Sequence, residues 1–222
     1  MTGGRAWGVV AVDLDGTLII GTTACLHLGD WIGHRRVIEE LERRFALGEI
    51  DSAAVADGDA PYYAGLTVDD ITLAMASVPC ISDIDEGVRC LNRDGISALI
   101  CTVSWTFAAK CLADRFGFVA VSGTVMGVDG VGRLSGRVER YFEPEDKVAF
   151  VRDYCSANGV GLDQVVAIGD GRSDLPLFRA VGFSVALNAS QDARAVASVA
   201  VESGSFMDAL RVVPGLLHPT DR

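Results

Sequence analysis

Two aspartates, Asp13 and Asp15, directly follow a short apolar run at residues 7–12. A run rich in β-branched residues predicts a buried strand of a parallel sheet, and ligands bind at the carboxyl ends of such strands. Gly16 permits a backbone bend that a side chain would oppose. Carboxylates this close repel each other unless a cation or a proton lies between them. The stretch therefore favours a metal-assisted nucleophile beside an acid/base group, and the alternative is an ordinary polar turn.

The composition bounds the possible classes of protein. With 222 residues, half of them hydrophobic, the chain can form one large α/β domain or a core domain with a small insert. The formal charge of −11 argues against binding to nucleic acid or to an anionic membrane. The six cysteines include no Cys-x-x-Cys pair, and no apolar run is long enough to span a membrane. We therefore expect a cytoplasmic protein with reduced thiols.

Helical periodicity dominates the segment after Thr17. Helices are predicted over residues 23–33, 37–47 and 53–60, and a fourth starts near Thr67 and Asp70, whose spacing is close to a capping box. No strand pattern interrupts this stretch. We therefore predict a helical cap domain at residues 19–78 and a core domain formed by residues 1–18 and 79–222; the alternative is that these helices simply cover the sheet.

Strands and helices alternate again after residue 79. The predicted fold class is α/β: a Rossmann-like parallel sheet core flanked by helices, with a small all-helical cap inserted after the first strand and a β flap. A glycine-rich stretch at 123–141 supplies the flap, with a hairpin turn at 128–131. Disorder is expected after Pro214. The predicted strands are 96–101, 119–121, 165–168, 183–187 and 199–201, and the predicted helices are 82–93, 106–116, 144–158, 175–181, 192–197 and a last one from 206.

Polar residues that follow or precede the predicted strands form four stations. The stations are Asp13 with Asp15, Thr102, Lys147, and Asp170 with Asp174. In a parallel sheet these positions meet at one edge. Four carboxylates without a histidine or cysteine ligand suit a hard cation, above all Mg²⁺. A threonine hydroxyl and a lysine ammonium then suit an anion that the cation also binds, most simply a phosphoryl group.

With these stations in order, the chain resembles the haloacid dehalogenase-like phosphatases, and among them the phosphoserine-phosphatase-like branch, which has a helical cap. The resemblance extends from Val9 to about Ala209. Residues 13–17 match the first motif of the family, Thr102 the second, Lys147 the third and residues 169–174 the fourth.

The resemblance implies a role for each matching residue. Asp13 is the nucleophile that becomes an aspartyl phosphate, and Asp15 is the general acid and base. Thr102 and Lys147 complete the catalytic set. The phosphoryl group is held by Asp13, Thr102, Val103 and Lys147. The metal site for the expected cofactor, Mg²⁺, consists of Asp13, Asp15 through its carbonyl, Asp170 and Asp174.

The chain departs from the serine-specific members of the family in three places. Those members carry a glutamate for the substrate amine shortly after the first motif, whereas residues 19–23 contain no acid. Val103, Ser104 and Trp105 stand where two glycines follow the second motif, and Ser173 replaces a usual asparagine. The indole of Trp105 can stack on a sugar or base, or pack under the cap. The candidates for substrate selectivity are Thr22, Thr23, Ser104, Trp105 and Ser173.

The predicted function is Mg²⁺-dependent hydrolysis of a small phosphomonoester, such as a sugar, polyol or biosynthetic-intermediate phosphate, rather than phosphoserine. The alternatives are a phosphotransferase or mutase on the same scaffold, a phosphoserine phosphatase, and a non-catalytic phosphate-binding protein. Asp13 and Asp15 argue against the last alternative, because a binding protein needs no acid/base residue. The expected partner is a small phosphomonoester, with no nucleic acid and no membrane, and the expected state is a monomer or homodimer.

Overall fold

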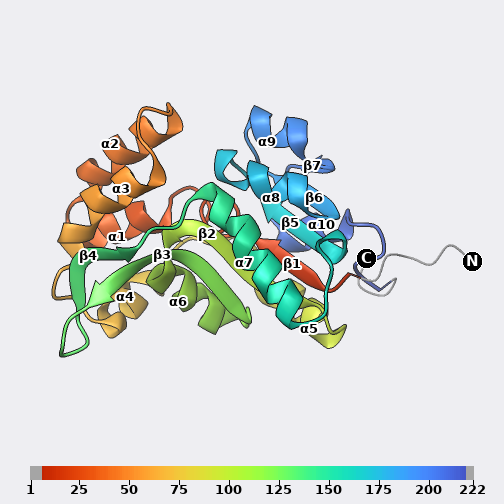
Figure 1. Ribbon diagram of the computed structural model, residues 1–222, viewed down its shortest axis with the longest axis horizontal. Coiled ribbons are helices and arrows are strands. Elements are labelled where there is room, and N and C mark those ends of the chain that lie inside the picture. The colour runs from red at the N-terminus through yellow and green to blue at the C-terminus, as the bar shows by residue number, and fades with distance from the viewer. Residues whose placement is uncertain (1–6, 219–222) are drawn as a thin grey trace, which may run out of the picture.

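A computed structural model describes residues 7–218 and shows a central sheet of seven strands (Figure 1). The strand order is β4-β3-β2-β1-β5-β6-β7, and all neighbouring strands are parallel except β3 and β4. The predicted α/β fold class is therefore confirmed. The strands are β1 (Val9–Val12), β2 (Ser97–Trp105), β3 (Ala120–Val128), β4 (Leu134–Arg140), β5 (Val165–Gly169), β6 (Phe183–Leu187) and β7 (Val199–Val201).

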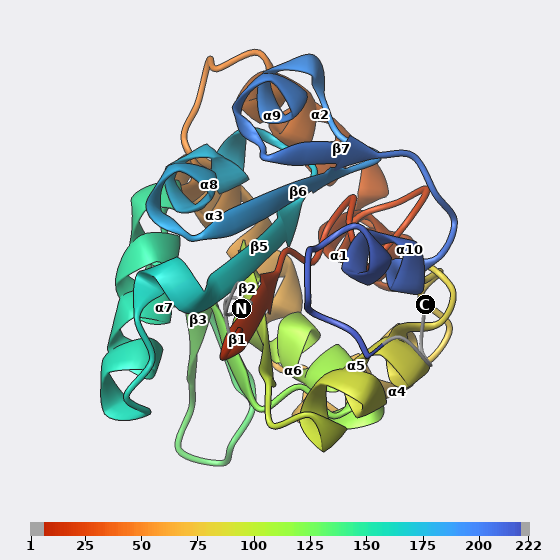
Figure 2. The same cartoon turned by 90° about the vertical axis from the view of Figure 1, so that its right-hand side faces the viewer.

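Helices cover both faces of the sheet, which explains why its central strands β1 and β5 are apolar (Figure 2). Val10 and Val12 of β1 belong to the apolar cluster under α5, α6 and α10, whereas Val9 and Ala11 belong to the cluster under α7, α8 and α9. β1 is thus buried on both sides. These helices are α5 (Ile84–Arg93), α6 (Thr106–Phe116), α7 (Pro144–Ala157), α8 (Leu175–Ala180), α9 (Gln191–Val196) and α10 (Phe206–Arg211), with the 3₁₀ turns η2 (Leu162–Gln164) and η3 (Arg172–Asp174).

The segment between β1 and α5 is helical, as the sequence predicts. It comprises α1 (Ala24–Ile32), α2 (Arg35–Ala46), α3 (Ser52–Asp59), the 3₁₀ turn η1 (Ala60–Tyr63) and α4 (Val68–Met75). Thr23, Asp51 and Thr67 cap the starts of α1, α3 and α4 through their side chains. Leu28 and Ile38 lie in the same apolar cluster as one face of the sheet. Whether residues 19–78 form a domain of their own therefore stays a prediction.

β2 and β3 are longer than the sequence predicts. β2 continues past Cys101 to Trp105, and its pairing with β3 shifts register between those two residues. The predicted end of β2 at Thr102 is therefore wrong, because pairing with β3 extends the strand beyond its apolar run. The predicted hairpin turn at 128–131 falls where the antiparallel strands β3 and β4 are joined, and there the backbone N–H of Asp129 donates to the carbonyl of Arg133 at 2.8 Å.

The chain after α10 packs back onto the core. Leu216 and Leu217 are buried, and the indole N–H of Trp7 donates to the carbonyl of Pro214 at 2.9 Å. Disorder directly after Pro214 is therefore wrong, and residues 219–222 lie outside the described chain. Within residues 7–218, none of the helices combines the length and apolar character that crossing a membrane requires.

Candidate active site

The sheet brings three of the four stations into direct contact. Asp13 follows β1, Asp174 follows β5, and Lys147 lies in the first turn of α7. The Lys147 ammonium is fully buried and donates to Asp13 Oδ1 at 2.6 Å and to Asp174 Oδ1 at 2.7 Å. A longer contact of 3.4 Å reaches the hydroxyl of Ser173. Residues that are 134 and 27 positions away from Lys147 in the sequence thus share one buried cation.

Two glycines allow the acidic loops to approach each other. Gly16 has a φ of +79°, and a Cβ atom there would overlap the carboxylate of Asp170. A Cβ atom at Gly169 would overlap the carboxylate of Asp174 in the same way. Glycine at position 16 is therefore required for the first motif to approach the fourth, and glycine at position 169 for the fold of the fourth-motif loop itself.

The carboxylates of Asp13, Asp170 and Asp174 form a cluster that suits a metal ion, since one oxygen from each lies within 4.8 Å of the others. Asp174 is already engaged: Lys147 contacts one oxygen, and the N–H groups of Asp170 and Gly171 donate to the other at 3.1 Å. Asp174 therefore orders the loop, while Asp13 and Asp170 are the better placed to ligate. An all-oxygen donor set of this kind fits Mg²⁺.

The electrostatics of the cluster also indicate a need for a cation. Burial, followed by repulsion from Asp174, raises the pKa of Asp13 well above its ordinary value and that of Asp170 to about 7. Burial lowers the pKa of Lys147, but attraction to Asp13 and Asp174 outweighs it and raises that pKa overall. One ammonium therefore does not offset three carboxylates, and a bound divalent cation would lower the carboxylate pKa values.

Asp15 points away from this cluster. Its Oδ1 accepts from the N–H of Ala24, at the start of α1, at 2.6 Å, and its side chain is not part of the metal cluster. Burial raises the pKa of Asp15, although the hydrogen bonds from Ala24 and Ser104 oppose the rise. A carboxyl with a raised pKa can hold a proton for a leaving group. Any contact of Asp15 with a metal would thus involve its carbonyl, as the family resemblance implies.

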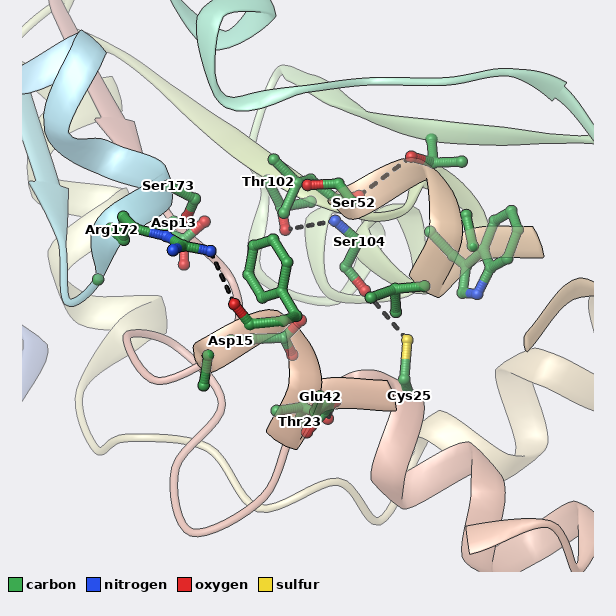
Figure 3. Close-up of a pocket in the computed structure, with 18 of the residues that line it drawn as sticks. Asp13, Asp15, Thr23, Cys25, Glu42, Ser52, Thr102, Ser104, Arg172 and Ser173 are labelled. Atoms are coloured by element: carbon green, nitrogen blue, oxygen red, sulfur yellow. Dashed lines mark hydrogen bonds between the residues drawn. The ribbon is translucent and has the colours of Figure 1, made fainter. Parts of the chain in front are cut away.

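A pocket of about 360 Å³ lies between the acidic loops and helices α1 to α3 (Figure 3). Thr102 lies in its wall and is buried, and its hydroxyl accepts from the N–H of Ser104 at 3.0 Å. Of the other predicted site residues, Asp13, Asp15, Asp170, Thr23, Val103, Ser104, Trp105 and Ser173 also line the pocket. Thr22 does not.

Glu42 lines the pocket as well, although it was not among the predicted site residues. It comes from α2, and its Oε1 accepts from the hydroxyl of Thr23 at 2.5 Å. Burial raises the pKa of Glu42 to about 7. Residues 19–23 contain no acid, but the pocket is not without one, because α2 supplies the carboxylate of Glu42. The available signal was the position of Glu42 on the apolar stripe of its helix, with Ile38 and Phe45.

Trp105 packs against α3 and η1, where it contacts Asp59 and Tyr63. Its side chain is 2% exposed and stacks on Phe107 with ring centres 5.5 Å apart. The indole N–H donates to Asp59 Oδ2 at 2.6 Å, and the other oxygen of Asp59 contacts His34 Nε2 at 2.7 Å. Of the two interpretations of Trp105, packing is the one that the structure supports.

Arg172 links the fourth motif to α2. Its guanidinium donates to the carbonyl of Phe45 at 2.7 Å and lies 5.0 Å from the centre of the Phe45 ring. Arg172 and Phe45 also line a second cavity of about 660 Å³ between α3 and α8. This pair therefore stands at the boundary between the inner pocket and the outer cavity.

The fold and the site together define a hydrolase class built on a parallel sheet with acidic loops at its carboxyl edge. Residues 10–179 match the haloacid dehalogenase-like hydrolase family, and the chain belongs to that family. Its place within the family is the phosphoserine-phosphatase-like branch.

Two curated relatives illustrate the similarity. A phosphoserine phosphatase of Streptomyces coelicolor is 30% identical over 96% of this chain, which spans only 51% of that protein. A phosphoserine phosphatase of Albidiferax ferrireducens is 26% identical over 89% of this chain and 86% of its own length. A solved phospho-aspartyl intermediate analogue of phosphoserine phosphatase has the same fold, with a TM-score of 0.80 and 16% identity over 94% of this chain and 100% of its own.

Proposed function

We propose that the protein is a Mg²⁺-dependent phosphatase that hydrolyses a small phosphomonoester through a phosphorylated Asp13. The observation that carries this proposal is the contact of one fully buried lysine with Asp13 and Asp174. The Asp13 carboxylate thus lies beside the Lys147 ammonium, directly after β1, and lines the inner pocket. A carboxylate nucleophile divides a difficult ester hydrolysis into two easier steps.

The residues divide the chemistry between them. Asp13 attacks phosphorus, and the leaving oxygen takes a proton from Asp15. Asp15, now ionised, takes a proton from the water that attacks the phosphoryl group on Asp13, which frees phosphate, restores the Asp13 carboxylate and leaves Asp15 protonated again. Lys147 and Thr102 hold phosphoryl oxygens during both steps. Mg²⁺, held by Asp13, Asp170 and the carbonyl of Asp15, with Asp174 ordering the loop, would neutralise the charge of the phosphoryl group.

Selectivity comes from residues 19–78, which we propose act as a cap domain over the leaving group. The inner pocket combines the hydroxyls of Thr23 and Ser104 with apolar walls from Phe45, Val55 and Trp105. This lining supports a sugar, polyol or biosynthetic-intermediate phosphate as the substrate. Phosphoserine phosphatase is the second candidate, because Glu42 offers a carboxylate to a substrate amine.

The free thiols of all six cysteines fit the cytoplasmic location that we also propose.

A screen of phosphomonoesters, with and without Mg²⁺, tests the proposed function. p-Nitrophenyl phosphate should be hydrolysed with Mg²⁺ and not in EDTA. Full activity in EDTA would overturn the metal assignment, and the absence of any hydrolysis with Mg²⁺ would overturn the phosphatase assignment.

A further inference from the structure

Ser52 lines both the inner pocket and the outer cavity, and its hydroxyl is buried. The residue is 8% exposed and is the first residue of α3. Among the described residues its hydroxyl has no hydrogen-bond partner. Burying a hydroxyl without a partner costs free energy, so a polar ligand at this position would be stabilised.

The start of α3 is fixed without the Ser52 side chain. Asp51 caps the helix by accepting from the N–H of Ala54 at 2.8 Å. Glu143, from the loop before α7, accepts from the N–H of Ala53 at 3.0 Å. Ser52 is therefore held in place by its neighbours, and its own hydroxyl is not needed for helix capping.

Glu42 supplies a second polar group from another helix. Its contact with Thr23 uses Oε1, which is one of its two oxygens. In Figure 3, Ser52 lies in the upper part of the pocket, and Glu42 lies with Thr23 in the lower part. Apolar residues of the pocket wall include Val55 and Ala56. The pocket thus has polar groups at separate places in a largely apolar surface.

We propose that Ser52 and Glu42 bind two hydroxyl groups of the leaving group, so that the substrate is the phosphate ester of a polyol or sugar. This inference rests on the proposed phosphatase function. A hydroxyl both donates and accepts, so it can pair with the serine and with the carboxylate in either protonation state. An ammonium group only donates, so it pairs best with the ionised carboxylate and cannot accept from the protonated one or from the serine.

The charges around the pocket favour a neutral leaving group over an amino acid. Asp15, Glu42 and Asp59 already line it. Arg172 is the one lysine or arginine among the described lining residues, and its guanidinium contacts the Phe45 carbonyl at the pocket boundary. The carboxylate of phosphoserine would therefore lack a cationic partner deep in the pocket.

The test compares Ser52→Ala and Glu42→Gln with the unchanged protein on glycerol 3-phosphate, erythritol 4-phosphate, glucose 6-phosphate, phosphoserine and p-nitrophenyl phosphate. For the best polyol or sugar phosphate, kcat/KM should fall about tenfold in Ser52→Ala and about thirtyfold in Glu42→Gln, and for the aryl phosphate it should fall by a clearly smaller factor. Ser52→Thr, which keeps the hydroxyl, should restore most of the loss.

Matched controls are Ser77→Ala and Glu40→Gln, which alter exposed residues of the same helical segment outside the pocket. Circular dichroism should show that every variant is folded. The inference is overturned if Ser52→Ala and Glu42→Gln lower aryl phosphate turnover as much as polyol phosphate turnover, or if phosphoserine is the best substrate. If the unchanged protein fails to hydrolyse even the aryl phosphate, the phosphatase proposal itself fails, which is a different result.

Discussion

Replacing Glu42 by glutamine should stabilise the folded protein at neutral and alkaline pH. The carboxylate is largely buried, and burial is the main cause of its raised pKa. The hydrogen bond from Thr23 opposes that rise, while repulsion from Asp15 and Asp59 adds to it. Glutamine keeps the shape and can still accept from the Thr23 hydroxyl, so the substitution removes mainly the charge.

The magnitude follows from the difference between the two pKa values. The pKa of Glu42 rises from an ordinary value of 4.5 to about 7 in the folded protein. The folded state therefore binds more protons than the unfolded state between these values, and stability falls as the pH rises through this window. At about 1.36 kcal/mol per pKa unit, the full penalty above pH 7 is about 3 kcal/mol, and it vanishes below about pH 4.5.

The assay is urea unfolding of both proteins in metal-free buffer at several pH values. Glu42→Gln should match the unchanged protein near pH 4.5 and exceed its free energy of unfolding by up to about 3 kcal/mol at pH 8. Glu40→Gln is the control on the same helix, because Glu40 is exposed and paired with Arg43, so it should not gain stability as the pH rises. Equal stability of Glu42→Gln and the unchanged protein at pH 8 would refute the reasoning.

Three further predictions concern the catalytic set and the cap. Lys147→Met leaves buried carboxylates without their ammonium and should lower the free energy of unfolding by about 3–5 kcal/mol, measured by urea unfolding in metal-free buffer. Lys110→Met is the control, and it should have little effect because the partner of Lys110 is a surface carboxylate. Asp13→Asn should abolish phosphoenzyme formation from p-nitrophenyl phosphate, while Asp15→Asn should form it and turn over about 10²- to 10⁴-fold more slowly; trapping phosphate on the first variant alone would reverse these roles. Arg172→Ala removes the hydrogen bond to the Phe45 carbonyl at the end of α2, so hydrogen exchange of the backbone amides of residues 45–50 should become faster. Unchanged protection of these amides would contradict a role for Arg172 in holding α2 against the fourth motif.

Local features of this protein are readable in its sequence. The Thr67 hydroxyl accepts from the N–H of Asp70 at 3.1 Å, and Asp70 accepts from the N–H of Thr67 at 2.8 Å, as the spacing predicts. The helix predicted over residues 106–116 has those same bounds in the structure. Both depend on contacts within a few residues. The meeting of Asp13 with Asp174 was also predictable, because strand ends of a parallel sheet share one edge.

Features that depend on how distant segments dock were decided only by the tertiary structure. Glu42 is separated from Asp15 by most of two helices, and although it lies on the apolar stripe of α2, that stripe does not show that the pocket is what it faces. Trp105 could stack on a ligand or pack, and its contact with Asp59, 46 residues away, decides for packing. Periodicity shows which face of a helix is apolar, but the partner of that face depends on the packing of the whole chain.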